Sequence, residues 1–331
     1  MSGGVAPTAN HEGDFSSCEA AMESPDVRSL VEAVVIVTGG SNGIGAETVR
    51  HFVSHGSKVM IADLESTAKD AEVLVASLSH PEKAIFHPTN VLCWEDMKTL
   101  FKKTIEYHGR IDIVIANAGI METKSVFDLG SVDSEGELQE SIEGFRVLDV
   151  NLKGTLNTLR LAMYHMQRNQ TWFHQTSAAA SSPSASPSRG SIVIVTSTSG
   201  YFGSSGVGAY VASKHGLVGL LRSSQLAARA IGVKVNAVAP FYTPTPTFSK
   251  KLSGMWEAAG LKANTVDGVA NAIVQTSLAS TSGRCVLIAG GATKEVEAAR
   301  TDLLSLWLGE SVATILQTAG KVFAEKGYPL N

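Results

Sequence analysis

The chain has 331 residues, of which 44% are hydrophobic and 18% are charged, and its formal net charge is −4. This composition supports a sizeable core, and the slightly acidic balance predicts no nucleic-acid partner. The apolar runs are strand-sized and too short to span a bilayer, so no membrane partner is expected. Three widely spaced cysteines indicate neither a disulfide framework nor a zinc site and fit a reducing compartment. We therefore expect a cytoplasmic protein without a bound metal.

Residues 1–29 are rich in Gly, Ala, Ser and Asn, lack an apolar signal segment and predict a disordered tail. Beyond them, short β-branched runs alternate with longer segments of helical period. The pattern predicts strands at 33–38, 58–63, 83–89, 111–117, 191–197, 234–239 and 284–289, and helices at 43–56, 66–80, 94–109, about 138–168, about 208–231 and about 265–280. Apolar strands alternating with helices indicate a parallel sheet covered on both faces. The expected fold class is α/β, a doubly wound Rossmann fold of about seven strands in one domain, 30–291.

Three segments depart from this regular pattern. Residues 171–190 are rich in Ser, Ala and Pro and predict a loop insertion between a helix end and a strand start, at the edge opposite the site. Residues 240–263 carry several aromatic side chains and are expected to form a substrate lid. Residues 292–331 form a C-terminal extension, within which 295–310 has helical apolar spacing. That helix either covers the pocket or meets a partner subunit.

The stretch VTGGSNGIGAE, at 37–47, follows the first predicted strand and opens the first predicted helix. Gly39, Gly43 and Gly45 would allow a tight turn and let backbone N–H groups approach a pyrophosphate at the positive end of the helix dipole. The same letters match the G-x-S-x-G elbow of a hydrolase, which also needs an acid and then a histidine later in the chain. That elbow belongs deeper in the sheet than the first strand, and the last histidine is His215. The dinucleotide turn is the favoured interpretation.

Asp63 ends the second predicted strand, where an acid can accept hydrogen bonds from the two adenosine ribose hydroxyls. A 2′-phosphate would instead meet this carboxylate with like charge. No lysine or arginine offsets that repulsion at the neighbouring positions, which are Ser41, Asn42 and Leu64. The pattern favours NAD over NADP, and a helix-capping acid is the alternative role of Asp63.

The stretch AYVASKHG, at 209–216, places Tyr210 and Lys214 one helical turn apart. A free tyrosine has a pKa of about 10 and exchanges no proton usefully at neutral pH. An ammonium group beside it would favour the phenolate and lower that pKa. The pair is therefore a candidate acid/base, and an ordinary surface pair at i,i+4 spacing is the structural alternative.

Several motifs follow one another in a fixed order: TGGSNGIG (38–45), ANAG (116–119), DVNLKG around Asn151, Ser197, YVASK (210–214) and VNAVAP (235–240). In this order they resemble the short-chain dehydrogenase/reductase family, in its single-domain branch, and within it natural-product alcohol dehydrogenases of secondary metabolism. The resemblance implies a catalytic tetrad of Ser197, Tyr210, Lys214 and Asn151. It also implies cofactor contacts from Gly39, Ser41, Asn42, Gly43, Ile44, Gly45, Asp63, Asn90, Val91, Asn117, Ala118, Gly119, Tyr210, Lys214, Thr243 and Thr245.

The resemblance also supplies the roles. Tyr210 as phenolate would take the alcohol proton in oxidation and return it in reduction. Lys214 would lower the pKa of Tyr210 and bind the nicotinamide ribose, and Ser197 would hold the substrate oxygen. Asn151 would anchor a water that links Lys214 to solvent; alternatively, it satisfies a helix kink.

The chain departs from the family pattern at two places. Asn90 stands where the family has an aspartate for the adenine amino group, and its amide oxygen can still accept that bond. Phe241 follows Pro240 where the family has glycine. Because phenylalanine does not adopt positive φ cheaply, the resemblance does not fix the path of this loop.

The predicted substrate is a bulky, mainly apolar secondary alcohol or its ketone, such as a terpenoid, steroid or polyketide. The expected apolar lining is Met121, Tyr201, Phe202, Phe241, Tyr242, Phe248, Leu252, Met255 and Trp256. The resemblance further implies a homodimer or homotetramer that pairs through the 208–231 helix. Two other functions stay open. An NADPH-dependent ketoreductase would need a cation near residues 41, 42 or 64, and a non-catalytic nucleotide sensor or scaffold would usually lack the tyrosine or the lysine.

Overall fold

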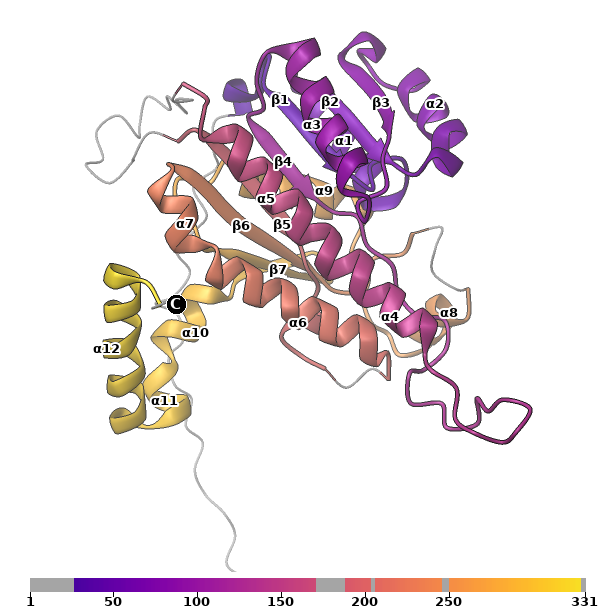
Figure 1. Cartoon of the computed structure of the whole chain (residues 1–331), viewed down its shortest axis with the longest axis vertical. Helices are drawn as coiled ribbons and strands as arrows, with labels where there is room; N and C mark the ends of the chain where they lie inside the picture. The colour runs from indigo at the N-terminus through magenta and orange to yellow at the C-terminus, as the bar shows by residue number, and fades with distance from the viewer. Residues whose placement is uncertain (1–26, 171–187, 204–205, 246–249, 329–331) are drawn as a thin grey trace, which may run out of the picture.

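The computed structural model describes residues 27–170, 188–203, 206–245 and 250–328 (Figure 1). Its centre is an eight-stranded sheet in the order β3-β2-β1-β4-β5-β6-β7-β8. The strands are β1 (Val34–Thr38), β2 (Lys58–Asp63), β3 (Ala84–Pro88), β4 (Ile113–Ala116), β5 (Gly190–Val195), β6 (Val233–Pro240), β7 (Cys285–Ala289) and β8 (Ala292–Glu295). Every pair is parallel except β7 with β8. The predicted doubly wound α/β fold is confirmed, and an eighth, antiparallel strand joins the seven expected ones.

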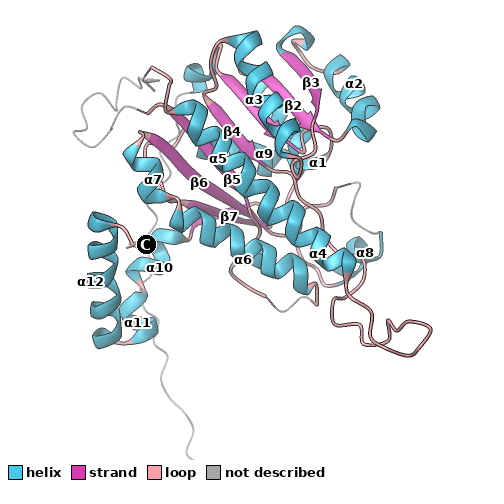
Figure 2. Ribbon diagram, viewed as in Figure 1, coloured by secondary structure: helices cyan, strands magenta, loops and turns pink. Residues whose placement is uncertain are grey.

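Helices cover both faces of the sheet. They are α1 (Gly43–Ser54), α2 (Ala68–Ala76), α3 (Trp94–His108), α4 (Ile142–Leu148), α5 (Gly154–Met166), α6 (Gly208–Ser223), α7 (Gln225–Ala230), α8 (Lys250–Ala258), α9 (Val266–Ser277), α10 (Glu297–Asp302), α11 (Leu304–Leu308) and α12 (Glu310–Lys326). Figure 2 shows α3, α5 and α6 crossing the near face, with α9 seen behind the strands. The layers are therefore helix, sheet, helix.

Two apolar clusters hold these layers together because successive side chains of a strand point to opposite faces. On β1, Val35 and Val37 pack against apolar side chains of α1 and α9. Phe52 of α1 and Ile273 of α9 are two of these side chains. Ile36, between the two valines, belongs to the opposite cluster, which α3, α5 and α6 complete. All five β1 residues are buried, which explains why the strand reads as a continuous apolar run rather than an alternating one.

Two predicted helices are divided in the structure. The helix expected at about 138–168 begins at Ile142, and a π-helical turn, η4 (Asp149–Lys153), separates α4 from α5. The helix expected at about 208–231 divides at Ser224 into α6 and α7. Most of the predicted 171–190 insertion lies outside the described residues, as does nearly all of the 1–29 tail. Asn169 joins the two ends of the insertion, since its Nδ2 donates to the carbonyls of Ile111 and Arg189 at 2.7 and 2.8 Å.

The C-terminal extension contributes β8 to the sheet and then three helices. Figure 1 shows α11 and α12 side by side at the edge of the molecule, beyond α10. None of the helices in the described part of the chain is both long and apolar enough to cross a membrane.

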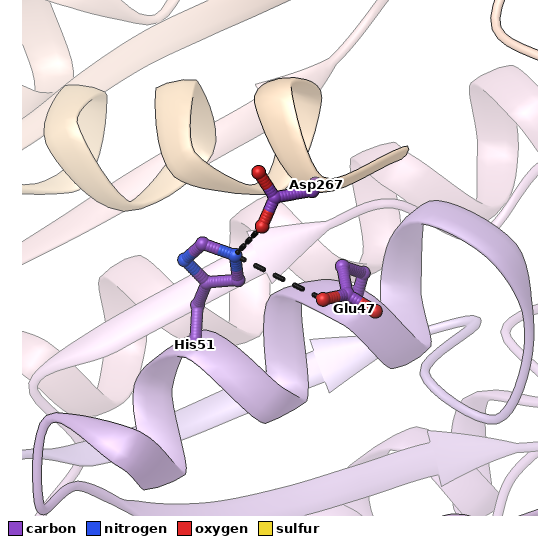
Figure 3. Close-up of side chains that lie close together, drawn as sticks. All are labelled: Glu47, His51 and Asp267. Atoms are coloured by element: carbon purple, nitrogen blue, oxygen red, sulfur yellow. Dashed lines mark hydrogen bonds and ion pairs between the residues drawn. The ribbon is translucent and has the colours of Figure 1, made fainter. Parts of the chain in front are cut away.

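A polar contact joins α1, the helix that follows the glycine turn, to α9 (Figure 3). His51 Nε2 is hydrogen-bonded to Asp267 Oδ1 at 2.8 Å, and Glu47, one turn before His51, lies 3.9 Å from the same nitrogen. The three side chains are close enough to share a metal ion. The hydrogen bond to Asp267 already engages the imidazole nitrogen that would be a ligand, so the cluster is accounted for as a helix-to-helix contact.

Candidate active site

The predicted site residues meet at one edge of the sheet. Parallel pairing places Thr38 beside Ala116, and Ala116 beside Ile194, so β1, β4 and β5 end together. β6 ends at the same edge, since its Val238 pairs with Val195. The segments that follow these strand ends carry nearly all the residues that the motifs predicted, which is where open α/β sheets bind ligands.

The glycine turn has the backbone that its sequence predicted. Gly39 and Gly43 have φ of +63° and +54°, a region that L side chains rarely adopt. A Cβ on Gly45 would lie 2.0 Å from the Gly39 carbonyl oxygen, so only glycine allows this approach. α1 begins at Gly43, directly after the turn, and its first amides point out of the helix at the positive end of its dipole. The turn fits a dinucleotide pyrophosphate by its backbone alone.

Asn117 locks the end of β4 to this turn. Its Nδ2 donates to the carbonyls of Thr38 and Gly39 at 3.1 and 2.9 Å. The amides of Asn117 and Ala118 both donate to the Thr38 hydroxyl. Asn117 therefore stabilises the cofactor turn through its side-chain nitrogen.

Asp63 lies beside the turn, as predicted. Its Oδ2 accepts a hydrogen bond from the Ser41 amide at 3.0 Å, and its Oδ1 accepts one from the Leu64 amide at 2.8 Å. The predicted ribose acid is thus held by the backbone of the glycine turn. Each carboxylate oxygen keeps a further acceptor position.

A hollow of about 320 Å³ adjoins Ser41 and Asn42. Sequence reasoning about positions 41, 42 and 64 missed Arg50, which lines this hollow from the next turns of α1. The Arg50 guanidinium is bonded to the Ser77 hydroxyl and lies 3.5 Å from Glu47. Glu47 and Asp70 line the same hollow, so acids outnumber the one cation there.

Tyr210 lies in the first turn of α6 with its side chain close to Ser197. The Ser197 hydroxyl also donates to the Pro240 carbonyl at 3.3 Å and accepts from the Ser199 amide at 3.1 Å. Burial raises the pKa of Tyr210 above its usual value; the bond to Ser197 acts against this, and the Glu122 carboxylate adds to it. The expected lowering of this pKa is not found, because burial is the largest effect and Lys214 is not among the groups that shift it.

Lys214 is buried beneath the site. Its Nζ donates to the Val195 carbonyl at 3.0 Å and lies 5.5 Å from the centroid of the Tyr210 ring. Burial lowers the pKa of Lys214 to about 8. The surface i,i+4 pair that was the alternative for this tyrosine and lysine is excluded, because Lys214 is 5% exposed and donates to a backbone carbonyl.

Asn151 lies in the π-helical turn η4 and is fully buried. Its Oδ1 accepts from the Ile120 amide, and its Nδ2 donates to the Ile120 carbonyl and to the Ser213 hydroxyl, all within 2.9 Å. A Cβ added to Gly119 would lie 3.2 Å from Asn151 Oδ1 and 3.7 Å from Lys214 Nζ. Asn151 and Lys214 therefore both lie beside Gly119. The helix irregularity expected at Asn151 is present as the π-helical turn.

The loop after β6 closes over the turn. The Phe241 amide donates to the Ile288 carbonyl, which extends the ladder between β6 and β7, and Phe241 does not adopt positive φ. Thr245 reaches the glycine turn, since its Cγ2 lies 3.3 Å from where a Cβ on Gly43 would be. Thr243 is turned inward instead: its hydroxyl donates to the Phe241 carbonyl and accepts from Asn264.

The predicted apolar lining is present in part. Trp256, on α8, contacts the rings of Phe241 and Tyr242, with centroids 5.1 and 4.8 Å away. Met121, Phe202 and Met255 are exposed. Tyr201 differs from the prediction, because its hydroxyl donates to Glu297 at 2.9 Å and so points toward the C-terminal extension. Phe248 and the side chain of Leu252 lie outside the described residues.

Two predicted adenine contacts have structural partners. Asn90 Oδ1 accepts from the Leu92 amide at 3.0 Å, which uses one of the two acceptor positions expected for adenine. Val91 is buried against Gly154, and its carbonyl accepts from Asn157 Nδ2 at 3.0 Å. Ile44, also among the predicted contacts, packs partly buried against the core under α1.

Comparison with known proteins agrees with this geometry. Residues 33–256 match the family model described as short chain dehydrogenase. The chain is 34% identical to the short-chain dehydrogenase/reductase ascJ of Acremonium egyptiacum, over 83% of this chain and 84% of that protein. It is also 34% identical to short-chain dehydrogenase reductase 3c of Arabidopsis thaliana, over 78% and 94% of the two chains. The chain therefore belongs to the short-chain dehydrogenase/reductase family of oxidoreductases, which use a nicotinamide cofactor.

Proposed function

We propose that the protein is an NAD-dependent dehydrogenase that interconverts a bulky, mainly apolar secondary alcohol and its ketone. The catalytic residues in this proposal are Ser197, Tyr210, Lys214 and Asn151. The observation that carries it is that Ser197 and Tyr210 lie together, with Lys214 anchored to the Val195 carbonyl, at the sheet edge where the glycine turn lies. Family membership supports a nicotinamide oxidoreductase in general, and these contacts support the more specific assignment.

A bound nicotinamide would supply or accept the hydride. Tyr210 exchanges the proton of the substrate oxygen, as phenolate in oxidation and as phenol in reduction. Ser197 holds that oxygen, since its hydroxyl can exchange its bond to the Pro240 carbonyl for one to the substrate. The raised pKa of Tyr210 keeps the phenol protonated, and a cation close to the ring would favour the phenolate.

Lys214 and Asn151 lie behind Tyr210. With a pKa of about 8, Lys214 can both hold and release a proton near neutral pH. Asn151 binds Ser213 and Ile120, and it meets Lys214 across Gly119. We assign Asn151 to shaping a water-filled proton path from Lys214 to solvent.

The preference for NAD rests on Asp63. The Ser41 and Leu64 amides hold its carboxylate at the end of β2, where two ribose hydroxyls could donate to it. Glu47 and Asp70 add negative charge around the neighbouring hollow and disfavour a 2′-phosphate. Arg50 is the one observation that favours the alternative, an NADPH-dependent ketoreductase, and its bonds to Ser77 and Glu47 oppose that role.

The substrate class rests on the aromatic cluster of Phe241, Tyr242 and Trp256 within the 240–263 lid. We keep the homodimer or homotetramer as a proposal, with a change of surface. Leu217 and Leu221 of α6 are in the core and cannot contact a partner. Phe145 on α4 and Leu156 on α5 are about half exposed and offer the apolar surface instead.

The test is a pair of dissociation constants, for NADH and for NADPH, measured by tryptophan fluorescence quenching on the purified full-length chain. We expect tight NADH and weak NADPH binding, followed by NAD⁺-dependent oxidation within a panel of apolar secondary alcohols. Tight NADPH binding would support the ketoreductase. Binding of neither cofactor would contradict the proposed function.

A further inference from the structure

A buried carboxylate caps the helix that carries the proposed catalytic tyrosine. Glu122 is 4% exposed, and its two oxygens accept hydrogen bonds from the Ala209 and Tyr210 amides at 2.8 and 2.9 Å. Amides of a first helical turn have no partner within the helix, and the positive end of the dipole favours an anion there. Val207, which precedes α6, has no side chain that could accept such a bond. Glu122 thus supplies the cap from a distant segment.

The segment that ends in Glu122 binds three parts of the site in turn. Asn117 is bonded to the glycine turn through the Thr38 and Gly39 carbonyls. Ile120 exchanges two hydrogen bonds with Asn151. Glu122 then binds the first turn of α6. Residues 117–122 therefore set the position of the cofactor turn, the π-helical turn and the tyrosine helix relative to one another.

We propose that Glu122 is a positioning residue, which holds the first turn of α6 so that the Tyr210 hydroxyl meets Ser197 and the substrate oxygen. The role of Tyr210 rests on the proposed function. The bond is made to the Tyr210 amide itself, so a displacement of the cap displaces the Tyr210 Cα directly. Such shifts at a reacting group are costly, because proton transfer requires hydrogen-bond distance.

Glu122 also acts on Tyr210 through its charge, because the carboxylate raises the pKa of the tyrosine. The other ionisable groups on α6 are Lys214, His215 and Arg222, and those on the packed elements α4 and η4 are Glu143, Arg146, Asp149 and Lys153. Lys214 donates to Val195, and Glu143 accepts from the Thr123 and Lys124 amides. Glu143 is therefore a control, because it is a nearby carboxylate whose backbone amide partners, Thr123 and Lys124, lie outside α6.

The experiment compares Glu122→Gln, Glu122→Ala and the control Glu143→Gln in the full-length chain. The pKa of Tyr210 is measured from tyrosinate absorbance, as the difference between each variant and the same variant carrying Tyr210→Phe. We expect Glu122→Gln to lower this pKa, because it removes the negative charge and keeps an oxygen that can accept one amide. Glu143→Gln should leave it unchanged.

Two further readouts separate positioning from folding. Hydrogen exchange at the Ala209 and Tyr210 amides should accelerate strongly in Glu122→Ala and less in Glu122→Gln, which retains an acceptor. With NAD⁺ and cyclohexanol as probe substrates, Glu122→Ala should lower kcat by about tenfold or more at unchanged NAD⁺ affinity. If Glu122→Ala does not fold, the titration and hydrogen exchange of Glu122→Gln test the proposal.

An unchanged Tyr210 pKa in Glu122→Gln, or an equal change in Glu143→Gln, would overturn this inference. Wild-type hydrogen-exchange rates at the Ala209 and Tyr210 amides in Glu122→Ala would also overturn it. Failure of the proposed function looks different: the wild type would not bind NADH, or Tyr210→Phe would keep its turnover. The titration and the exchange rates need no substrate, so they report on Glu122 in either case.

Discussion

Lys214 and Tyr210 lie one turn apart on α6, yet the lysine Nζ donates to the Val195 carbonyl and stays 5.5 Å from the centroid of the tyrosine ring. The lysine is thus anchored to the end of β5, and the tyrosine lies close to Ser197, which follows the same strand. Strand β5 therefore positions both groups, and the predictions below test what each contributes.

Replacing Tyr210 by phenylalanine removes the hydroxyl that would exchange the substrate proton. Turnover should fall by about a thousandfold, in the range of general acid/base catalysis, while the NADH dissociation constant stays within about twofold. Steady-state kinetics and fluorescence quenching check the two parts. Tyr164→Phe, on the half-exposed Tyr164 of α5, is the control and should be silent. Normal turnover in Tyr210→Phe would exclude the mechanism.

The stability of the folded chain should depend on pH because of the buried Lys214. The folded chain releases this proton near its lowered pKa of about 8, whereas an unfolded chain keeps it to 10.5. Between these values the unfolded state binds more protons, so stability rises with pH, by up to about 3 kcal/mol. The penalty of burying the charged lysine is fully present below about pH 8 and is relieved as the pH rises through that window.

Urea unfolding of the wild type and Lys214→Met at about pH 7 and about pH 10 measures this effect as the change in their stability difference. The free energy of unfolding of the wild type should increase relative to that of Lys214→Met as the pH rises. Lys98→Met, at an exposed ion pair with Glu95, is the control and should show no such trend. A stability difference that does not depend on pH would show that Lys214 is not buried as a titrating group.

Asp63→Ala removes the proposed ribose acceptor together with its negative charge. The NADH dissociation constant should rise by about tenfold and that of NADPH should fall or hold, so that selectivity relaxes. Glu65→Ala makes the same charge change at an exposed position two residues later and should leave selectivity intact. If Asp63→Ala keeps the wild-type selectivity, Asp63 serves the backbone alone, as a brace for Ser41.

Gly45→Ala introduces a Cβ that would lie 2.0 Å from the Gly39 carbonyl oxygen. The turn must open to accept it, so NADH affinity should fall by at least about tenfold, and stability should fall as well. Gly219→Ala provides the opposite case, because a Cβ on this α6 glycine meets nothing within 4 Å. That change should stabilise the helix by about 0.5–1 kcal/mol, since alanine is the better helix former. Equal NADH affinity in the two variants would contradict the role of the turn.

The alternation of strands and helices and the motifs at their junctions could both be predicted from the amino-acid sequence. Both are local: β-branched runs such as 34–38 form strands, and the glycines after them are needed by backbone geometry at those positions. The resemblance also implied that Ser197 and Tyr210 belong to one site, and the two side chains lie close together in the structure.

Other features depend on burial and on contacts between distant segments, and these could be seen only in the folded structure. The pKa of Tyr210 is raised rather than lowered, because desolvation outweighs its neighbours, and no spacing in the sequence reports the depth of a side chain. The cap of α6 comes from Glu122, and Tyr201 turns to Glu297, across long stretches of chain. The short strand β8 is exposed along most of its length and pairs only with β7, so its pattern carried no apolar signal. These features arise from packing, which acts only once the fold has brought the segments together.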